Sequence, residues 1–158
     1  MRLALIFVVA LLLSVVGRAE SPEAVEGAQT VSLQEAFELF RQGALFIDVR
    51  DHASWQIGHV AGSVHLDFTS DEFVALYSSE SLDRDLPIVF YCDSELHNAS
   101  AMASYFAAQW GYTNVHYFRE GYFAWLAMDA PMTMGEDEYA QYVSAPNTPV
   151  QSETMLLK

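Results

Sequence analysis

Short apolar runs alternate with helical segments along most of this chain, and this alternation constrains the fold most strongly. The runs "ALFIDV", "GSVHL", "PIVFY" and "NVHYF" have the length and composition of buried strands. Segments of helical periodicity lie between them at residues 52–57, 70–79 and 99–110, one precedes them at residues 32–40, and another follows at residues 121–128. Such alternation favours a mostly parallel sheet with helices on both faces, so we expect an α/β domain.

Local signals give two of these helices definite features. Ser32 and Glu35 have the spacing of a capping box, which predicts a helix start at that point. The helix over residues 99–110 carries the clearest apolar stripe. Its apolar side chains recur at helical spacing, at Ala99, Met102, Ala103, Phe106, Ala107 and Trp110. We expect this stripe to be the buried face.

The ends of the chain differ from its middle. Residues 1–19 combine a basic start, an apolar run and small residues at positions 17 and 19, which predicts a secretory signal peptide cut after Ala19. An uncleaved membrane anchor is the alternative, although the run is shorter than the roughly 20 residues of a membrane span. We expect a flexible lead over residues 20–30, a folded domain over residues 31–132 and a disordered acidic tail over residues 133–158. The mature protein is expected in the periplasm or outside the cell, without membrane attachment.

The charge of the mature chain excludes some partners. Cleavage would remove Arg2 and Arg18 from the seven basic residues, leaving five against 21 acidic ones and a net charge of −16. Such a surface repels nucleic acid and anionic lipid, and it would either favour a basic protein partner or simply keep an exported protein soluble.

Cys92 is the single cysteine, so it cannot form an internal disulfide. It lies between a predicted buried strand and a predicted helix, where loop amides and the helix dipole would favour a thiolate. Two nearby acids, Asp93 and Glu95, oppose that charge. Cys92 is therefore either a nucleophile or a small apolar residue at the end of a strand.

Three segments resemble the rhodanese family of sulfurtransferases. They are "LFIDVRDHASWQIGHVAGSVHL", "IVFYC" with its following loop and helix, and "GYTNVHYFREGYFAWLAM". The resemblance spans about residues 31–132. It implies a parallel sheet of about five strands, and it implies that Cys92 accepts sulfane sulfur as a persulfide from a small donor or a persulfidated protein. No cofactor is implied.

The active-site loop departs from the family pattern. Single-domain members read Cys-x-x-Gly-x-Arg-Ser, and the substrate-binding loop here is Asp93, Ser94, Glu95, Leu96, His97 and Asn98. Glu95 replaces the glycine, His97 the arginine and Asn98 the serine. Neutral His97 cannot hold an oxyanion in a bidentate fork as arginine does, so we expect thiosulfate to be a poor donor.

Other polar residues have structural explanations. In this family context Asp48 and Arg50 are expected to form an ion pair at a strand end, and His59 to pack and hydrogen-bond. The histidines show no metal-ligand spacing, so no metal site is expected.

Two other functional classes remain. A non-catalytic rhodanese-like module would use the acidic loop to bind a basic protein. A cysteine phosphatase would need arginine six residues after Cys92, where Asn98 stands, and its phosphate would meet an acidic loop.

Overall fold

The protein forms a five-stranded parallel sheet, seen here in a computed structural model that describes residues 20–79 and 81–134. The strand order is β1-β6-β5-β2-β4, and each neighbouring pair is parallel. The strands are β1 (Gln29–Val31), β2 (Leu45–Asp48), β4 (Val64–His65), β5 (Ile88–Tyr91) and β6 (Val115–Phe118). The α/β class and the parallel sheet predicted from the sequence are confirmed. The predicted signal peptide and residues 135–158 of the predicted tail lie outside the described residues.

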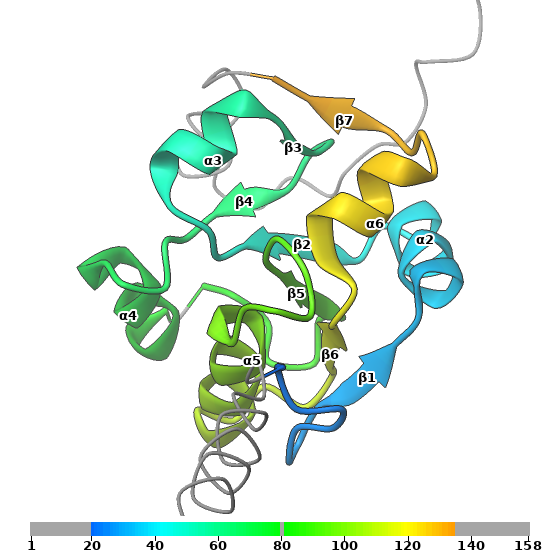
Figure 1. Cartoon of the computed structure of the whole chain (residues 1–158). Helices are drawn as coiled ribbons and strands as arrows, with labels where there is room; N and C mark the ends of the chain where they lie inside the picture. Colours follow the sequence, from blue (N-terminus) through cyan, green and yellow to red (C-terminus); the bar gives the residue numbers. More distant parts are fainter. Residues whose placement is uncertain (1–19, 80, 135–158) are drawn as a thin grey trace, which may run out of the picture.

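Helices cover both faces of the sheet (Figure 1). One face packs against α4 (Asp71–Ser78) and α5 (Ala99–Gln109), whose apolar side chains form a core with Ile47, Ile88 and Phe90. The other face packs against α2 (Leu33–Arg41) and α6 (Gly121–Ala127). In this layer the ring of Trp125 contacts the rings of Phe40 and Phe46. The three layers follow from strands whose side chains are apolar on both faces.

The start of α2 confirms the predicted capping box. The hydroxyl of Ser32 accepts from the backbone N–H of Glu35, and the carboxylate of Glu35 accepts from the backbone N–H of Ser32. Gly43, just beyond the helix, has φ of +82°, which glycine adopts without strain.

The expectation of a flexible lead over residues 20–30 needs correction. Gln29 and Thr30 belong to β1, which pairs with β6 at the edge of the sheet. Ser21 is buried, with 2% of its surface exposed, and it hydrogen-bonds to distant parts of the chain. The segment contains no apolar run, so its anchoring comes mainly from hydrogen bonds, with Ala28 as a small apolar contact to the core.

The buried face of α5 also differs from the predicted stripe. Met102 is 43% exposed, whereas Ser100 and Ser104 are buried. The hydroxyl of Ser104 donates to the carbonyl of Ser100 at 2.8 Å, so this polar group is satisfied inside the helix. The buried face of α5 therefore includes small serine side chains, which let the helix lie close to the sheet. The predicted stripe omitted them because it was built from apolar residues alone.

A second, two-stranded sheet was not predicted. It pairs β3 (His59–Val60) with β7 (Met132–Thr133) in antiparallel orientation, so ordered structure extends past residue 132. The connecting helix α3 (His52–Ile57) matches the predicted segment, with Asp51 as its N-cap. Within residues 20–79 and 81–134, no helix has the length and apolarity needed to cross a bilayer.

Candidate active site

Cys92 follows directly after β5, which lies between β2 and β6 in the middle of the sheet. The loop of residues 93–98 connects it to α5. This is the carboxyl edge of a parallel sheet, where the sites of α/β proteins occur. The residue is 1% exposed, so the loop closes over the sulfur.

Three groups lie within reach of the Cys92 sulfur. Its Sγ is 3.2 Å from the hydroxyl Oγ of Ser100, in the first turn of α5. Sγ is also 3.4 Å from the carbonyl oxygen of His97 and 3.7 Å from that of Ser94. Because carbonyl oxygens accept hydrogen bonds, these two contacts suit a thiol that donates its proton rather than a thiolate.

Burial raises the pKa of the Cys92 thiol above its ordinary value of 9.0. The hydroxyl and backbone N–H of Ser100 and the backbone N–H of Ser94 oppose this effect, and the charge of Asp93 reinforces it most weakly. The loop amides therefore act in the direction predicted from the sequence. Burial, rather than the neighbouring acids, is the main reason that the thiol remains protonated.

The start of α6 holds the first two peptides of the loop. The backbone N–H of Tyr122 donates to the carbonyl of Cys92 at 2.7 Å, and that of Phe123 donates to the carbonyl of Asp93 at 3.0 Å. Gly121 makes this approach possible, because its φ is +68° and a Cβ there would overlap the Cys92 carbonyl oxygen. The helix therefore fixes the backbone on which the sulfur is carried.

Arg50 connects the first family-like motif to this loop. Its Nη2 lies 2.6 Å from Oδ2 of Asp48, which is the expected ion pair, and its Nη1 lies 3.5 Å from Oδ1 of Asp93. The guanidinium also stacks 4.0 Å from the ring centroid of Tyr122 and donates to the carbonyl of Gly58. Burial alone would lower the pKa of Arg50, but the hydrogen bond and charge of Asp48, together with the charges of Tyr91 and Asp93, raise it overall. The charge of Asp93 is thus compensated inside the protein.

In the rest of the loop Leu96, His97 and Asn98 are exposed, whereas Ser94 and Glu95 are half-buried. His97 is exposed, and its Nδ1 is 3.8 Å from Oδ2 of Asp93. Leu96 is 48% exposed, and Asn98 is the N-cap of α5 without a side-chain capping bond. Glu95 has no positive φ, since Asp129 is the one non-glycine residue with positive φ in the described chain. The backbone here therefore does not adopt the conformation that a glycine at this position would allow.

His59 packs beneath the α3 segment. Its ring stacks on Trp55 with centroids 3.4 Å apart, and its Nδ1 lies 3.0 Å from the carbonyl oxygen of Trp55. It is 1% exposed, so its contacts are those of the packing residue expected from the sequence. No cluster of three or more His, Cys, Asp or Glu side chains suitable for a metal occurs within residues 20–79 and 81–134.

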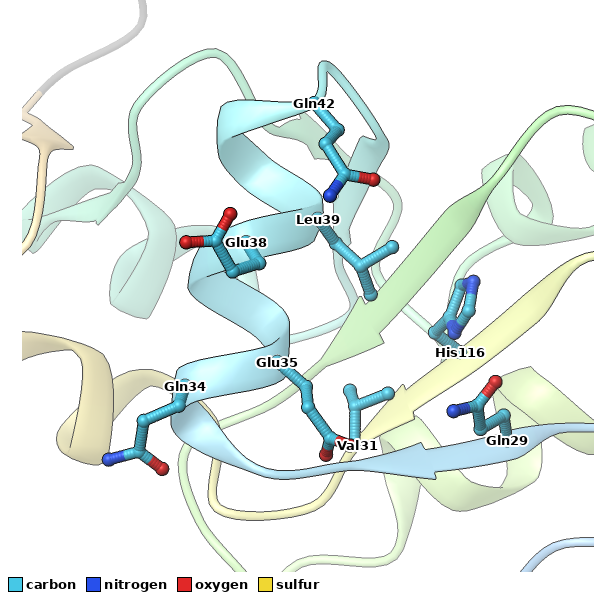
Figure 2. Close-up of a pocket in the computed structure, with 8 residues that line it drawn as sticks. All are labelled: Gln29, Val31, Gln34, Glu35, Glu38, Leu39, Gln42 and His116. Carbon is cyan, nitrogen blue, oxygen red and sulfur yellow. The ribbon is translucent and has the colours of Figure 1, made fainter.

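A shallow groove of about 420 Å³ lies elsewhere, between α2 and the strands β1 and β6 (Figure 2). It belongs to the face of the sheet that α2 covers, whereas Cys92 packs with the core on the α4 and α5 face. Its carboxylates are engaged, because Glu35 caps α2 and Glu38 pairs with Arg41. His116 lines it, but its unbonded Nδ1 is buried out of reach. The residues that line the groove include no nucleophile, so Cys92 is the stronger candidate for the active site.

Sequence reasoning missed several residues of the site. Ser100 lies eight positions after Cys92, and only its place in the first turn of the helix could have indicated it. Gly121 and Tyr122 come from a predicted helix, and a glycine at its start was the available signal for close backbone approach. Ser21 contacts the loop from the predicted flexible lead, where no local pattern pointed to it.

Comparison with known proteins gives a consistent result. The profile of the Rhodanese-like domain matches residues 32–128. Thiosulfate sulfurtransferase GlpE of Pseudomonas aeruginosa is 33% identical over 112 residues, which cover 70% of this chain and 96% of that protein. The protein of the same name from Haemophilus influenzae is 31% identical over 103 residues, which cover 65% of this chain and 91% of that protein.

Solved structures agree with the sequence relatives. The human single-domain sulfurtransferase TSTD1 is 28% identical, with a TM-score of 0.52 over 63% of this chain and 96% of that one. The polysulfide-sulfur transferase homodimer of Wolinella succinogenes has a TM-score of 0.57 at 19% identity, over 72% of this chain and 83% of that one. The second likeness concerns the fold alone.

Proposed function

Because the chain belongs to the rhodanese-like domain family, we propose that it is a sulfurtransferase whose Cys92 carries sulfane sulfur as a persulfide. A sulfurtransferase-like role agrees with the names of its relatives. The observation that carries the proposal is the position of Cys92, at the end of the central strand β5 with Ser100 Oγ 3.2 Å from its sulfur.

The proposed chemistry needs no cofactor. The Cys92 thiolate attacks the sulfane sulfur of a donor, a new S–S bond forms as the donor's own bond to that sulfur breaks, and the remainder leaves as an anion. A nucleophilic acceptor then attacks the outer sulfur and releases the Cys92 thiolate. The thiol proton must leave first. Since burial raises the pKa of Cys92, the loop has to open or rearrange before the sulfur becomes reactive.

We propose that polysulfide or a protein persulfide is a better donor than thiosulfate. Thiosulfate is a dianion that releases sulfite, so a fixed cation would stabilise its reaction. Arg50 contacts the loop at Asp93, but its guanidinium is already shared between Asp48 and Asp93. His97, at the family's arginine position, faces Asp93 instead.

Intact-mass measurement tests the proposal. The reduced protein is incubated with polysulfide, with thiosulfate or with a persulfidated protein, and it is then weighed. We expect the added mass of one sulfur with polysulfide, and no addition in Cys92→Ser. Ser104→Ala is a matched variant in α5, the helix that follows the loop. It removes a buried hydroxyl whose described hydrogen bond goes to the carbonyl of Ser100, and the variant should still accept sulfur.

A non-catalytic binding module is the second candidate. The burial of Cys92 and the two carbonyl oxygens at its sulfur favour it, because they stabilise a protonated thiol. Absence of sulfur uptake from every donor would support this module, with a basic protein as the proposed partner of the acidic chain.

Export is also part of the proposal. Cleavage after Ala19 would leave Glu20 as the first residue of a periplasmic or secreted protein. N-terminal sequencing of protein recovered from the periplasm or the medium tests it. A chain that retains Arg2 and stays with the membrane would contradict it.

A further inference from the structure

Ser21 contacts the active-site loop from a distant part of the sequence. Its backbone N–H donates to the carbonyl of Glu95 at 2.7 Å, across 74 positions of the chain. Only 2% of its surface is exposed, which is unusual for a serine in a segment without regular structure. Such burial indicates that the segment fits a defined seat on the domain.

Two side chains of the β6 region hold Ser21 in that seat. The hydroxyl of Tyr117 donates to Oγ of Ser21 at 2.9 Å, and Nε and Nη2 of Arg119 each donate to the Ser21 carbonyl at 3.2 Å. Nη2 of Arg119 also lies 3.4 Å from the carboxylate of Glu20. The backbone N–H, the hydroxyl and the carbonyl of Ser21 are therefore each hydrogen-bonded, the first to the loop and the other two to residues near β6.

The contact with Glu95 falls at the apex of the loop over Cys92. The carbonyls of Ser94 and His97, which touch the sulfur, flank that residue on either side. The start of α6 fixes the earlier part of the loop, through the carbonyls of Cys92 and Asp93. Within the loop, the N–H of His97 donates to the carbonyl of Ser94 at 3.1 Å, and Ser21 holds the apex from outside the loop. The position of the two carbonyls therefore depends on this turn and on Ser21 together.

We infer that Ser21 is a positioning residue, which holds the apex of the loop at Glu95 and so keeps the Cys92 sulfur covered. Detachment of residues 20–22 would free the apex while α6 continues to hold the base of the loop. The sulfur would then become accessible to a donor, and there would be space for the second sulfur of a persulfide. This inference rests on the proposed function for its biological meaning, but not for its test.

Alkylation of Cys92 by iodoacetamide tests it, because this reaction needs only an accessible thiolate. Ser21→Pro removes the N–H that donates to Glu95, and Ser21→Ala removes the hydroxyl that accepts from Tyr117. We expect the second-order rate to rise at least about fivefold in Ser21→Pro, as expected for the loss of one hydrogen bond, and at least about twofold in Ser21→Ala. The control Thr30→Ala removes a hydrogen bond to the carbonyl of Glu23 in the same part of the chain and should match the parent.

The possible outcomes are distinct. Rates in Ser21→Pro and Ser21→Ala that equal that of Thr30→Ala would overturn the inference. Circular dichroism shows whether each variant is folded. If Ser21→Pro does not fold, Ser21→Ala and Tyr117→Phe decide, because both break the same hydrogen bond without changing the backbone. An unchanged rate in both would also overturn it.

Sulfur uptake separates this inference from the proposed function. If alkylation accelerates in the Ser21 variants but polysulfide adds no sulfur to any protein, the positioning role stands and the sulfurtransferase proposal fails. If polysulfide adds sulfur at the same rate to all variants and alkylation does not change, the proposed function stands and the positioning role is wrong.

Discussion

Nη1 of Arg50 lies 3.5 Å from Oδ1 of Asp93, so an arginine within the first family-like segment, residues 45–66, reaches the residue directly after Cys92. The same guanidinium binds Asp48 at the end of β2. One cation thus joins the ends of two neighbouring strands, β2 and β5, at the carboxyl edge of the sheet. The negative charge of Asp93 in the loop is therefore partly compensated by the buried guanidinium of Arg50.

This arrangement predicts a large stability cost for Arg50→Met. The change would leave the fully buried carboxylate of Asp48 without its partner, which costs about 3–5 kcal/mol of unfolding free energy. Urea denaturation followed by circular dichroism measures the effect. The control is Arg41→Met, because the Arg41–Glu38 pair is exposed and should contribute at most about 1 kcal/mol. Equal effects of the two changes would contradict the structural role of Arg50.

The loop composition predicts how donor preference can be changed. The double change Glu95→Gly with His97→Arg should raise kcat/KM for thiosulfate at least about tenfold, which equals roughly 1.4 kcal/mol of transition-state stabilisation. The same change should help polysulfide less, since that donor depends less on a fixed cation. Steady-state rates with both donors, at low and high salt, measure this.

A matched control separates local from global charge in that experiment. Glu23→Gly with His52→Arg makes the same change of charge at two exposed positions outside the loop. We expect it to leave thiosulfate kcat/KM near that of the parent. Strong thiosulfate turnover by the parent, or a loop variant no better than this control, would show that the loop acids do not limit the reaction.

The burial of His116 predicts that the folded protein loses stability as the pH falls. Burial lowers its pKa below the ordinary 6.5, so the unfolded chain binds a proton more readily than the folded one. The contribution of His116 is therefore present above pH 6.5 and is lost as the pH falls below that value. Thermal unfolding between pH 7 and pH 5 should show a smaller decrease of Tm in His116→Gln than in the parent.

Removal of the chain after Met134 should change Tm by no more than a few degrees, because the predicted tail lacks apolar periodicity. A shorter chain that ends at Ala130 provides the contrast. It would lack β7 and the carbonyl of Pro131, which accepts from Nε1 of Trp125 at 2.9 Å and from the N–H of Ala61 at 3.1 Å. We expect a clearly larger decrease of Tm for that chain, measured by circular dichroism. If removal of the chain after Met134 lowers Tm as much as removal after Ala130 does, and by more than a few degrees, the tail packs on the domain.

The sequence alone determined the order of the helices and of the strands β2, β4, β5 and β6, and the place of the cysteine, but it did not reveal β1, β3 and β7. The apolar runs of β2, β5 and β6 and the capping box of α2 are local patterns, because strand burial and helix capping depend on residues a few positions apart. Cys92 at the end of β5 follows from the same patterns. The family resemblance added the expectation of sulfur chemistry, and the match over residues 32–128 confirms the family.

The tertiary structure alone decided the environment of the sulfur. Burial of Cys92 raises its pKa, and burial results from the packing of the whole loop. Gly121 lets α6 bind the Cys92 carbonyl, and Ser21 binds the Glu95 carbonyl from the beginning of the described chain. These partners are separated from the loop by tens of residues, and each is joined to it by a backbone hydrogen bond that any residue type except proline can donate. A glycine such as Gly121 can indicate that two backbone segments approach closely, but it does not identify the partner, so only the folded arrangement of the chain determines which amide meets which carbonyl.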